Sequence, residues 1–162
     1  MAVITGRVRK FGNNIDTDSI TPAAFLRAPI EEQVKKAFSP VTPDFYQTVK
    51  PGDILVAGDN FGCGSSREQA TQVVKTMGIK YIVCQSMARI YFRNCIAVGV
   101  FPIISQGAGQ LFNEGDEIEI DTDKNKIKNI KTGKSLPFQP IPEAIAPILA
   151  VGGILEYLKQ KI

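Results

Sequence analysis

A short apolar strand, a glycine-rich loop and an amphipathic helix in succession constrain the fold of this chain most strongly. The strand is predicted at residues 53–57, the loop at 58–65 and the helix at 66–77. One face of that helix carries apolar residues at helical spacing, namely Ala70, Val73, Val74 and Met77. A second apolar strand follows at residues 81–84. Two strands joined across a helix run parallel, so we expect a βαβ unit.

Other segments extend this unit into an α/β fold. Alternating residues predict a first strand at 3–11, another strand is predicted at 100–104, and a hairpin is predicted from 116–121 and 126–130. Residues 12–22 are polar and predict a loop. Helices are predicted at residues 31–38, 44–49, 87–98, 142–149 and 154–161. No break in composition divides the chain, so we expect a single domain over residues 1–162, with a mixed sheet and flanking helices.

Composition excludes several functional classes. The net charge of +3 comes without a block of basic residues, so we expect no nucleic-acid partner. No apolar stretch approaches the ~20 residues needed to span a bilayer, and the first residues lack the pattern of a signal peptide, so no membrane association is expected. The odd number of cysteines indicates a reducing, cytoplasmic setting: Cys63, Cys84 and Cys95.

The chain contains no histidine, which removes the commonest catalytic arrangements. Neither a Ser-His-Asp nor a Cys-His unit can be built from it, nor a histidine-ligated metal site. Its cysteines form no C-x-x-C pair and are too few for a four-cysteine zinc or iron–sulfur site. We therefore predict no metal ligands in the chain, and acid–base chemistry must use other side chains or groups of a partner.

The glycine-rich loop that precedes the predicted helix 66–77 is the candidate site. Free backbone N–H groups and the helix dipole favour an anion there. Ser65 and Glu68 have the spacing of a capping box, which is the structural alternative to a catalytic role for the serine. Arg67 would lie in the first helical turn, where a cation opposes the dipole, so an anionic ligand or a buried acidic partner is expected beside it.

Better-known loop motifs do not match this segment. The dinucleotide fingerprint needs a glycine where Arg67 stands, and the chain has neither a G-K-[ST] sequence nor a G-x-S-x-G elbow. What remains is an anion-binding loop with two serines and an arginine. Cys63, inside the loop, is interpreted as a small residue filling tight space, and Cys84 and Cys95 as core residues.

The loop string Asn60-Phe61-Gly62-Cys63-Gly64-Ser65-Ser66-Arg67-Glu68 resembles the swivelling domain of the aconitase superfamily. More narrowly, it is similar to the small subunits of 3-isopropylmalate dehydratase and homoaconitase. The resemblance covers nearly the whole chain in the same order, through residues 6–8, 10–18, 20–22, 88–94 and 152–155.

This resemblance implies a mobile β/β/α domain that closes over a large subunit carrying a [4Fe–4S] cluster, with no cofactor bound by the small chain itself. The reaction it implies is the dehydration and rehydration of a small hydroxy acid. By the same resemblance, Ser65 is the base that takes a proton from carbon and Asp18 is an active-site carboxylate. Ser66 and Arg67 bind the substrate, and Arg27 lies in the loop that contacts its variable end.

Chemistry supports the need for a partner. A serine hydroxyl is a weak base, but N–H groups and a nearby guanidinium would stabilise its alkoxide. Hydroxide is a poor leaving group that needs a Lewis-acidic metal, for which this chain has no ligands.

The substrate and the role stay open between alternatives. Isopropylmalate, an intermediate of leucine biosynthesis, is the first candidate. Arg27 would suit a carboxylate-bearing tail, which favours homoaconitate or a related acid as the second. A non-catalytic anion-binding module is a further alternative, and missing metal ligands argue against a stand-alone hydro-lyase. Arg89 and Arg93, four residues apart, are expected to form salt bridges within the domain or between subunits.

Overall fold

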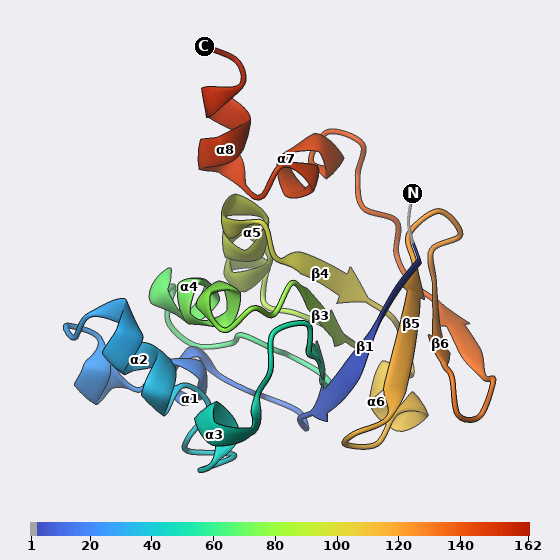
Figure 1. Cartoon of the computed structure of the whole chain (residues 1–162), viewed down its shortest axis with the longest axis horizontal. Coiled ribbons are helices and arrows are strands. Elements are labelled where there is room, and N and C mark those ends of the chain that lie inside the picture. Colours follow the sequence, from blue (N-terminus) through green and yellow to red (C-terminus); the bar gives the residue numbers. More distant parts are fainter. Residues whose placement is uncertain (1–2) are drawn as a thin grey trace.

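The computed structural model describes residues 3–162 and contains one seven-stranded mixed sheet (Figure 1). The strands lie in the order β4-β3-β2-β1-β5-β6-β7. Their bounds are β1 Val3–Lys10, β2 Ile54–Val56, β3 Tyr81–Cys84, β4 Phe101–Ile104, β5 Glu117–Asp121, β6 Lys126–Asn129 and β7 Ser135–Pro137. The predicted α/β class with a mixed sheet is confirmed.

Strand β1 joins a parallel half of the sheet to an antiparallel half. It pairs in parallel with β2, where Val8 is opposite Ile54, and antiparallel with β5, where Gly6 is opposite Ile118. The pairs β2–β3 and β3–β4 are parallel, whereas β5–β6 and β6–β7 are antiparallel. The βαβ unit predicted from residues 53–84 is therefore present.

The helical segments are α1 Thr17–Ile20, η1 Ala23–Phe25, α2 Ile30–Lys36, α3 Phe45–Thr48, α4 Gln69–Thr76, α5 Arg89–Val98, α6 Ala108–Leu111, α7 Ala146–Ala150 and α8 Ile154–Lys159. Several differ from the prediction. The predicted loop 12–22 contains the short helix α1, because Asp16 caps it by accepting a hydrogen bond from the Ser19 N–H at 2.7 Å. Helix α4 begins at Gln69 rather than Ser66, and α6 and β7 were missed because each is only one turn or three residues long.

Each face of the sheet has its own hydrophobic core. Leu55 and Ile82 point to the face covered by α2, α4 and α5, where they pack with Val73. Their neighbours Ile54 and Val83 point to the opposite face and pack with residues of the antiparallel half. This alternation follows from the two-residue period of a strand. Helices α7 and α8 lie beyond α5, with the C-terminus directed away from the sheet (Figure 1).

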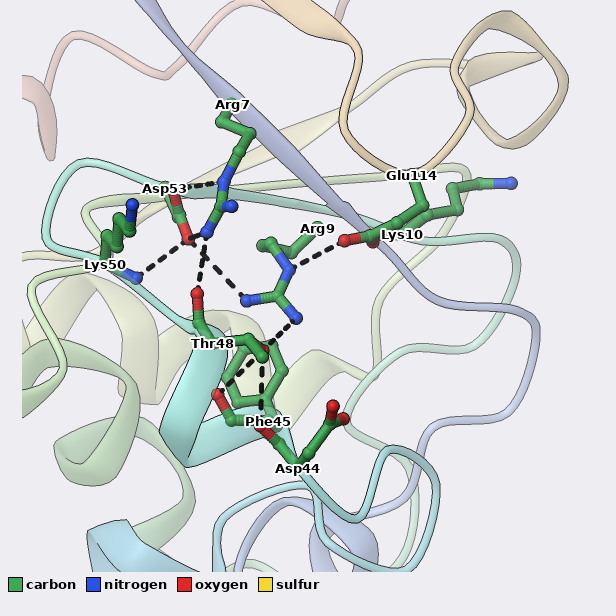
Figure 2. Close-up of polar contacts among 9 residues, drawn as sticks. All are labelled: Arg7, Arg9, Lys10, Asp44, Phe45, Thr48, Lys50, Asp53 and Glu114. Atoms are coloured by element: carbon green, nitrogen blue, oxygen red, sulfur yellow. Dashed lines mark hydrogen bonds and ion pairs between the residues drawn. The ribbon is translucent and has the colours of Figure 1, made fainter.

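Buried charges tie the N-terminal strand to helix α3 (Figure 2). Arg9 is 5% exposed; its Nε donates to Glu114 at 2.9 Å and its Nη2 to the Thr48 hydroxyl at 2.8 Å. Arg7 donates from Nη2 to Asp53 at 2.6 Å and to the Thr48 carbonyl at 2.8 Å. Both arginines are therefore neutralised by acids of the chain itself.

In the described part of the chain, no helix has the length and apolar character to cross a membrane.

Candidate active site

The candidate site lies where the carboxyl ends of three parallel strands meet. Strands β1, β2 and β3 run in one direction, so the loops after them share one edge of the sheet. Backbone hydrogen bonds join these loops: Gly62 N donates to the Ile15 carbonyl at 2.7 Å, and Phe61 N donates to the Ser86 carbonyl at 3.1 Å. The glycine-rich loop is thus held between its two neighbours.

The side chain of Tyr91 packs against the glycine-rich loop. Its ring contacts Phe61 edge-on, with 5.4 Å between ring centres, and its hydroxyl donates to the Ala70 carbonyl of α4 at 2.8 Å. Gly62 lies against this ring and has a backbone φ of +78°. A Cβ added to Gly62 would lie 2.3 Å from Tyr91 Cγ. The loop can therefore approach the aromatic ring only with glycine at this position.

Ser65 lies on the surface beside the hydroxyl of a buried threonine. Thr17 Oγ1 is 3.3 Å from Ser65 Oγ, and the Thr17 N–H donates to the Cys63 carbonyl at 2.8 Å. Thr17 is 2% exposed, whereas Ser65 is exposed. The sequence analysis named Asp18 but not Thr17, and the place of Thr17 directly before that aspartate was the available signal.

Arg67 is held by Asp18. Its Nη1 donates to Asp18 Oδ1 at 3.1 Å and to the Thr21 carbonyl at 3.0 Å. The backbone N–H of Ala23 donates to the same carboxylate at 3.0 Å, and together with the guanidinium it holds the pKa of Asp18 below its usual value. Asp18 is thus a carboxylate at neutral pH that fixes the guanidinium. Arg67 Nε and Nη2 form no hydrogen bond with residues 3–162 and can bind an external anion.

Free backbone donors lie beside this guanidinium. Within residues 3–162, the N–H groups of Gly64, Ser65 and Ser66 form no hydrogen bond. Ser66 is exposed, and its hydroxyl makes no hydrogen bond with these residues. Free backbone donors and a partly exposed cation on one loop suit a carboxylate ligand.

The predicted capping box at Ser65 and Glu68 is wrong. Helix α4 begins at Gln69, no side chain caps it, and Ser65 lies in the loop before it. Arg67 likewise precedes the helix instead of lying in its first turn. The spacing of a capping box occurred without its geometry because the loop is held by backbone contacts with its neighbours. Arg67 does have an acidic partner in Asp18, but the expectation that this acid would be buried is wrong, because its carboxylate is exposed.

Arg27 is not joined to the other candidate residues. It lies in the turn after η1, is exposed, and makes no hydrogen bond or ion pair with any residue of 3–162. Within residues 3–162, Arg67 is joined to Asp18 and Ser65 to Thr17 by hydrogen bonds, Ser66 lies between Ser65 and Arg67 in the loop, and no contact joins Arg27 to them.

The three cysteines form no disulfide with one another, and two of them are buried. Cys84 and Cys95 are fully buried, and burial together with the charge of Asp59 raises the pKa of Cys84 to about 12. The interpretation of both as core residues is confirmed, and such thiols are unreactive. Within the described part of the chain, no group of three His, Cys, Asp or Glu side chains could hold a metal ion, so an iron–sulfur cluster does not fit these residues.

Comparisons with known proteins agree with this geometry. Residues 5–107 match the aconitase C-terminal domain. The isopropylmalate/citramalate isomerase small subunit of Methanocaldococcus jannaschii is 47% identical over 99% of this chain and 96% of its own. The 3-isopropylmalate dehydratase small subunit 1 of Thermotoga maritima is 46% identical over 98% and 96% of the two chains. A crystal structure of 3-isopropylmalate dehydratase (LeuD) from M. jannaschii superposes with a TM-score of 0.93 at 41% identity, covering 99% of this chain and 95% of that one.

A mixed sheet with a serine–arginine loop at the carboxyl edge of its parallel half defines the class, and the chain belongs to the aconitase C-terminal domain family. Within that family, it is similar over its whole length to proteins named as 3-isopropylmalate dehydratase small subunits.

Proposed function

We propose that this chain is the small subunit of a heteromeric hydro-lyase that interconverts 2- and 3-isopropylmalate in leucine biosynthesis. The observation that carries the proposal is the guanidinium of Arg67, fixed by Asp18 beside Ser65, Ser66 and free backbone donors. Full-length similarity to small subunits with that name supports it. The free cysteines favour a cytoplasmic location.

Binding of the substrate falls to Arg67 and Ser66. Nε and Nη2 of Arg67, which donate no hydrogen bond within residues 3–162, can bind one carboxylate in a bidentate contact. The exposed Ser66 hydroxyl can add a hydrogen bond to it. Asp18 keeps the guanidinium in place, because its own carboxylate is fixed by the Ala23 N–H. A carboxylate held this way can accept the charge that develops when the adjacent carbon loses its proton.

Ser65 is the proposed base for that proton. The free N–H groups around it would stabilise its alkoxide, and Thr17 fixes the hydroxyl in position. Ser65 is exposed in this chain, and water weakens such electrostatic stabilisation. A second protein surface must therefore cover the site during the reaction.

That surface belongs to the proposed partner. We infer that residues 1–162 act as one swivelling domain that closes on a large subunit. A [4Fe–4S] cluster in that subunit would supply the Lewis acidity that a departing hydroxide needs. The present chain contributes the base and the carboxylate clamp, and no nucleic acid or membrane takes part.

Mixing the two subunits tests the proposal directly. Under anaerobic conditions, the purified chain alone should not convert isopropylmalate, whereas adding a cluster-bearing large subunit from the same organism should restore turnover. The measurement is the formation of the unsaturated intermediate by its ultraviolet absorbance. Full activity of the chain without any partner would contradict the proposal. Assembly without turnover would instead favour a non-catalytic anion-binding module.

Arg27 tests the choice of substrate. We expect the assembled enzyme to have a higher kcat/KM for isopropylmalate than for homoaconitate, and Arg27→Val to change the isopropylmalate value by less than about tenfold. The reason is that an apolar tail gains nothing from a guanidinium, whereas a charged hydrogen bond to a carboxylate is worth about 1.5–3 kcal/mol.

The matched control is Arg27→Lys, which keeps the charge. The second candidate, a homoaconitase small subunit, replaces the first if homoaconitate proves the better substrate and if that activity is lost in Arg27→Val but kept in Arg27→Lys. Citramalate, which the name of the M. jannaschii relative includes, belongs in the same assay because it carries a methyl group where isopropylmalate carries the isopropyl group.

A further inference from the structure

Arg89 and Arg93 of helix α5 have no acidic partner within residues 3–162, so of the two salt bridges expected for them only one between subunits remains open. Arg89 and Arg93 are both exposed and lie one turn apart. Neither forms a salt bridge with any residue of 3–162, so a bridge within the domain is absent for that part of the chain. Like charges at this spacing destabilise a helix slightly, and a cation at the first helical residue opposes the dipole. An anion from outside the chain would relieve both.

The two arginines line a groove whose other walls are largely apolar. The groove has a volume of about 530 Å³, and its apolar walls include Phe92, Ile96 and Ile145. Ile90, which follows Arg89 on the same helix but does not line the groove, is 51% exposed. Apolar side chains together with arginines are typical of the central parts of protein interfaces.

The groove continues from the candidate active site. Ser86 lines it, and the same residue contacts the glycine-rich loop: its carbonyl accepts from Phe61 N at 3.1 Å and its hydroxyl accepts from Asn60 N at 2.7 Å. A large subunit that covers Ser65 must meet this edge of the sheet. The start of α5, which follows β3 in the chain, is therefore part of the surface beside the glycine-rich loop that the large subunit would contact.

We propose that the α5 groove is a docking surface for an acidic, partly apolar segment of the large subunit. The inference rests on the proposed function, since it takes the partner from there. Carboxylates of that segment pair with Arg89 and Arg93, and its apolar side chains fill the space between Phe92 and Ile145. This contact fixes the orientation in which the Ser65 loop meets the partner.

Charge reversal tests the docking surface without touching Ser65 or Arg67. The variant Arg89→Glu with Arg93→Glu should bind the large subunit at least about tenfold more weakly, as measured by sedimentation or biolayer interferometry. The neutral pair Arg89→Gln and Arg93→Gln should weaken binding less than the reversal. Wild-type binding should weaken as salt is raised, and binding of the reversed variant should depend less on salt.

A matched control reverses two cations on the antiparallel half of the sheet. Lys126→Glu with Lys134→Glu makes the same change in net charge at exposed positions and should leave the dissociation constant within about twofold. Thermal melts of all variants should agree with wild type, since the side chains changed are exposed.

The outcomes separate the two proposals. If the wild-type chain assembles with the large subunit and turns over, but the reversed variant binds as tightly as wild type, the docking surface is wrong and the proposed function stands. If the control pair weakens binding as much as the reversal, only net charge matters and the groove is again wrong. If wild type binds no cluster-bearing subunit at all, both proposals fail.

Discussion

Replacing Ser65 with alanine is expected to lower kcat of the assembled enzyme by about 10²–10⁴-fold, the usual contribution of a positioned acid–base group. The hydroxyl is exposed and its only hydrogen-bonding neighbour among residues 3–162 is the Thr17 hydroxyl. Removing it should leave the fold intact. The measurement is kcat with saturating large subunit and isopropylmalate, together with the thermal melt of the free chain.

Two controls give this result its meaning. The variant must bind the large subunit as tightly as wild type, so that a loss of turnover is not a loss of assembly. Ser135→Ala changes an exposed serine on β7, in the antiparallel half of the sheet, and should keep wild-type kcat. A Ser65→Ala enzyme with wild-type rates would remove the catalytic role and favour the anion-binding module.

Gly62→Ala is expected to lower the free energy of unfolding by roughly 3 kcal/mol. A left-handed backbone costs a side-chain-bearing residue about 1–2 kcal/mol, and overpacking a core costs about 1–3 kcal/mol. Both apply here, since φ is +78° and the new Cβ would lie 2.3 Å from Tyr91 Cγ. Tyr91 is 2% exposed and hydrogen-bonded to Ala70, so it has little room to move. A chain of this length should melt about 6–12 °C lower.

Gly12→Ala is the matched control for this substitution. A Cβ at Gly12 would have no heavy atom within 4 Å, and the backbone there does not need a left-handed conformation. The control should change the melting temperature by less than about 2 °C. Equal melting temperatures for Gly62→Ala and wild type would show that the ring under the loop does not restrict it.

Local pattern was enough to predict the central part of the fold. Apolar runs at residues 53–57 and 81–84 with an amphipathic helix between them leave few arrangements besides a parallel βαβ unit, and the structure has it. The candidate residues of the glycine-rich loop were also visible, because glycines, serines and an arginine before a helix favour an anion whatever lies around them. Weakly periodic short elements such as α1, α6 and β7 were not predicted.

The partners of the site residues could not be predicted in the same way. Asp18 and Arg67 are separated by 49 positions and meet only because β1 and β2 are neighbours. The pairing of β1 with β2 also brings Thr17 into contact with Ser65. From local spacing alone, Ser65 had been predicted to cap a helix. A capping box depends on where the helix starts, and backbone contacts between loops moved that start to Gln69.

The sequence by itself determined which groups this protein has for chemistry: two serines and an arginine on a glycine-rich loop, without histidines or enough cysteines for a metal site. It did so because residue type limits acid–base and ligand chemistry in any conformation. Only the tertiary structure decided that Arg67 is fixed by Asp18, that Ser65 is exposed, and that Arg89 and Arg93 are unpaired within the described chain. These facts depend on which distant segments the parallel strands bring to one edge, and local propensity carries no information about that.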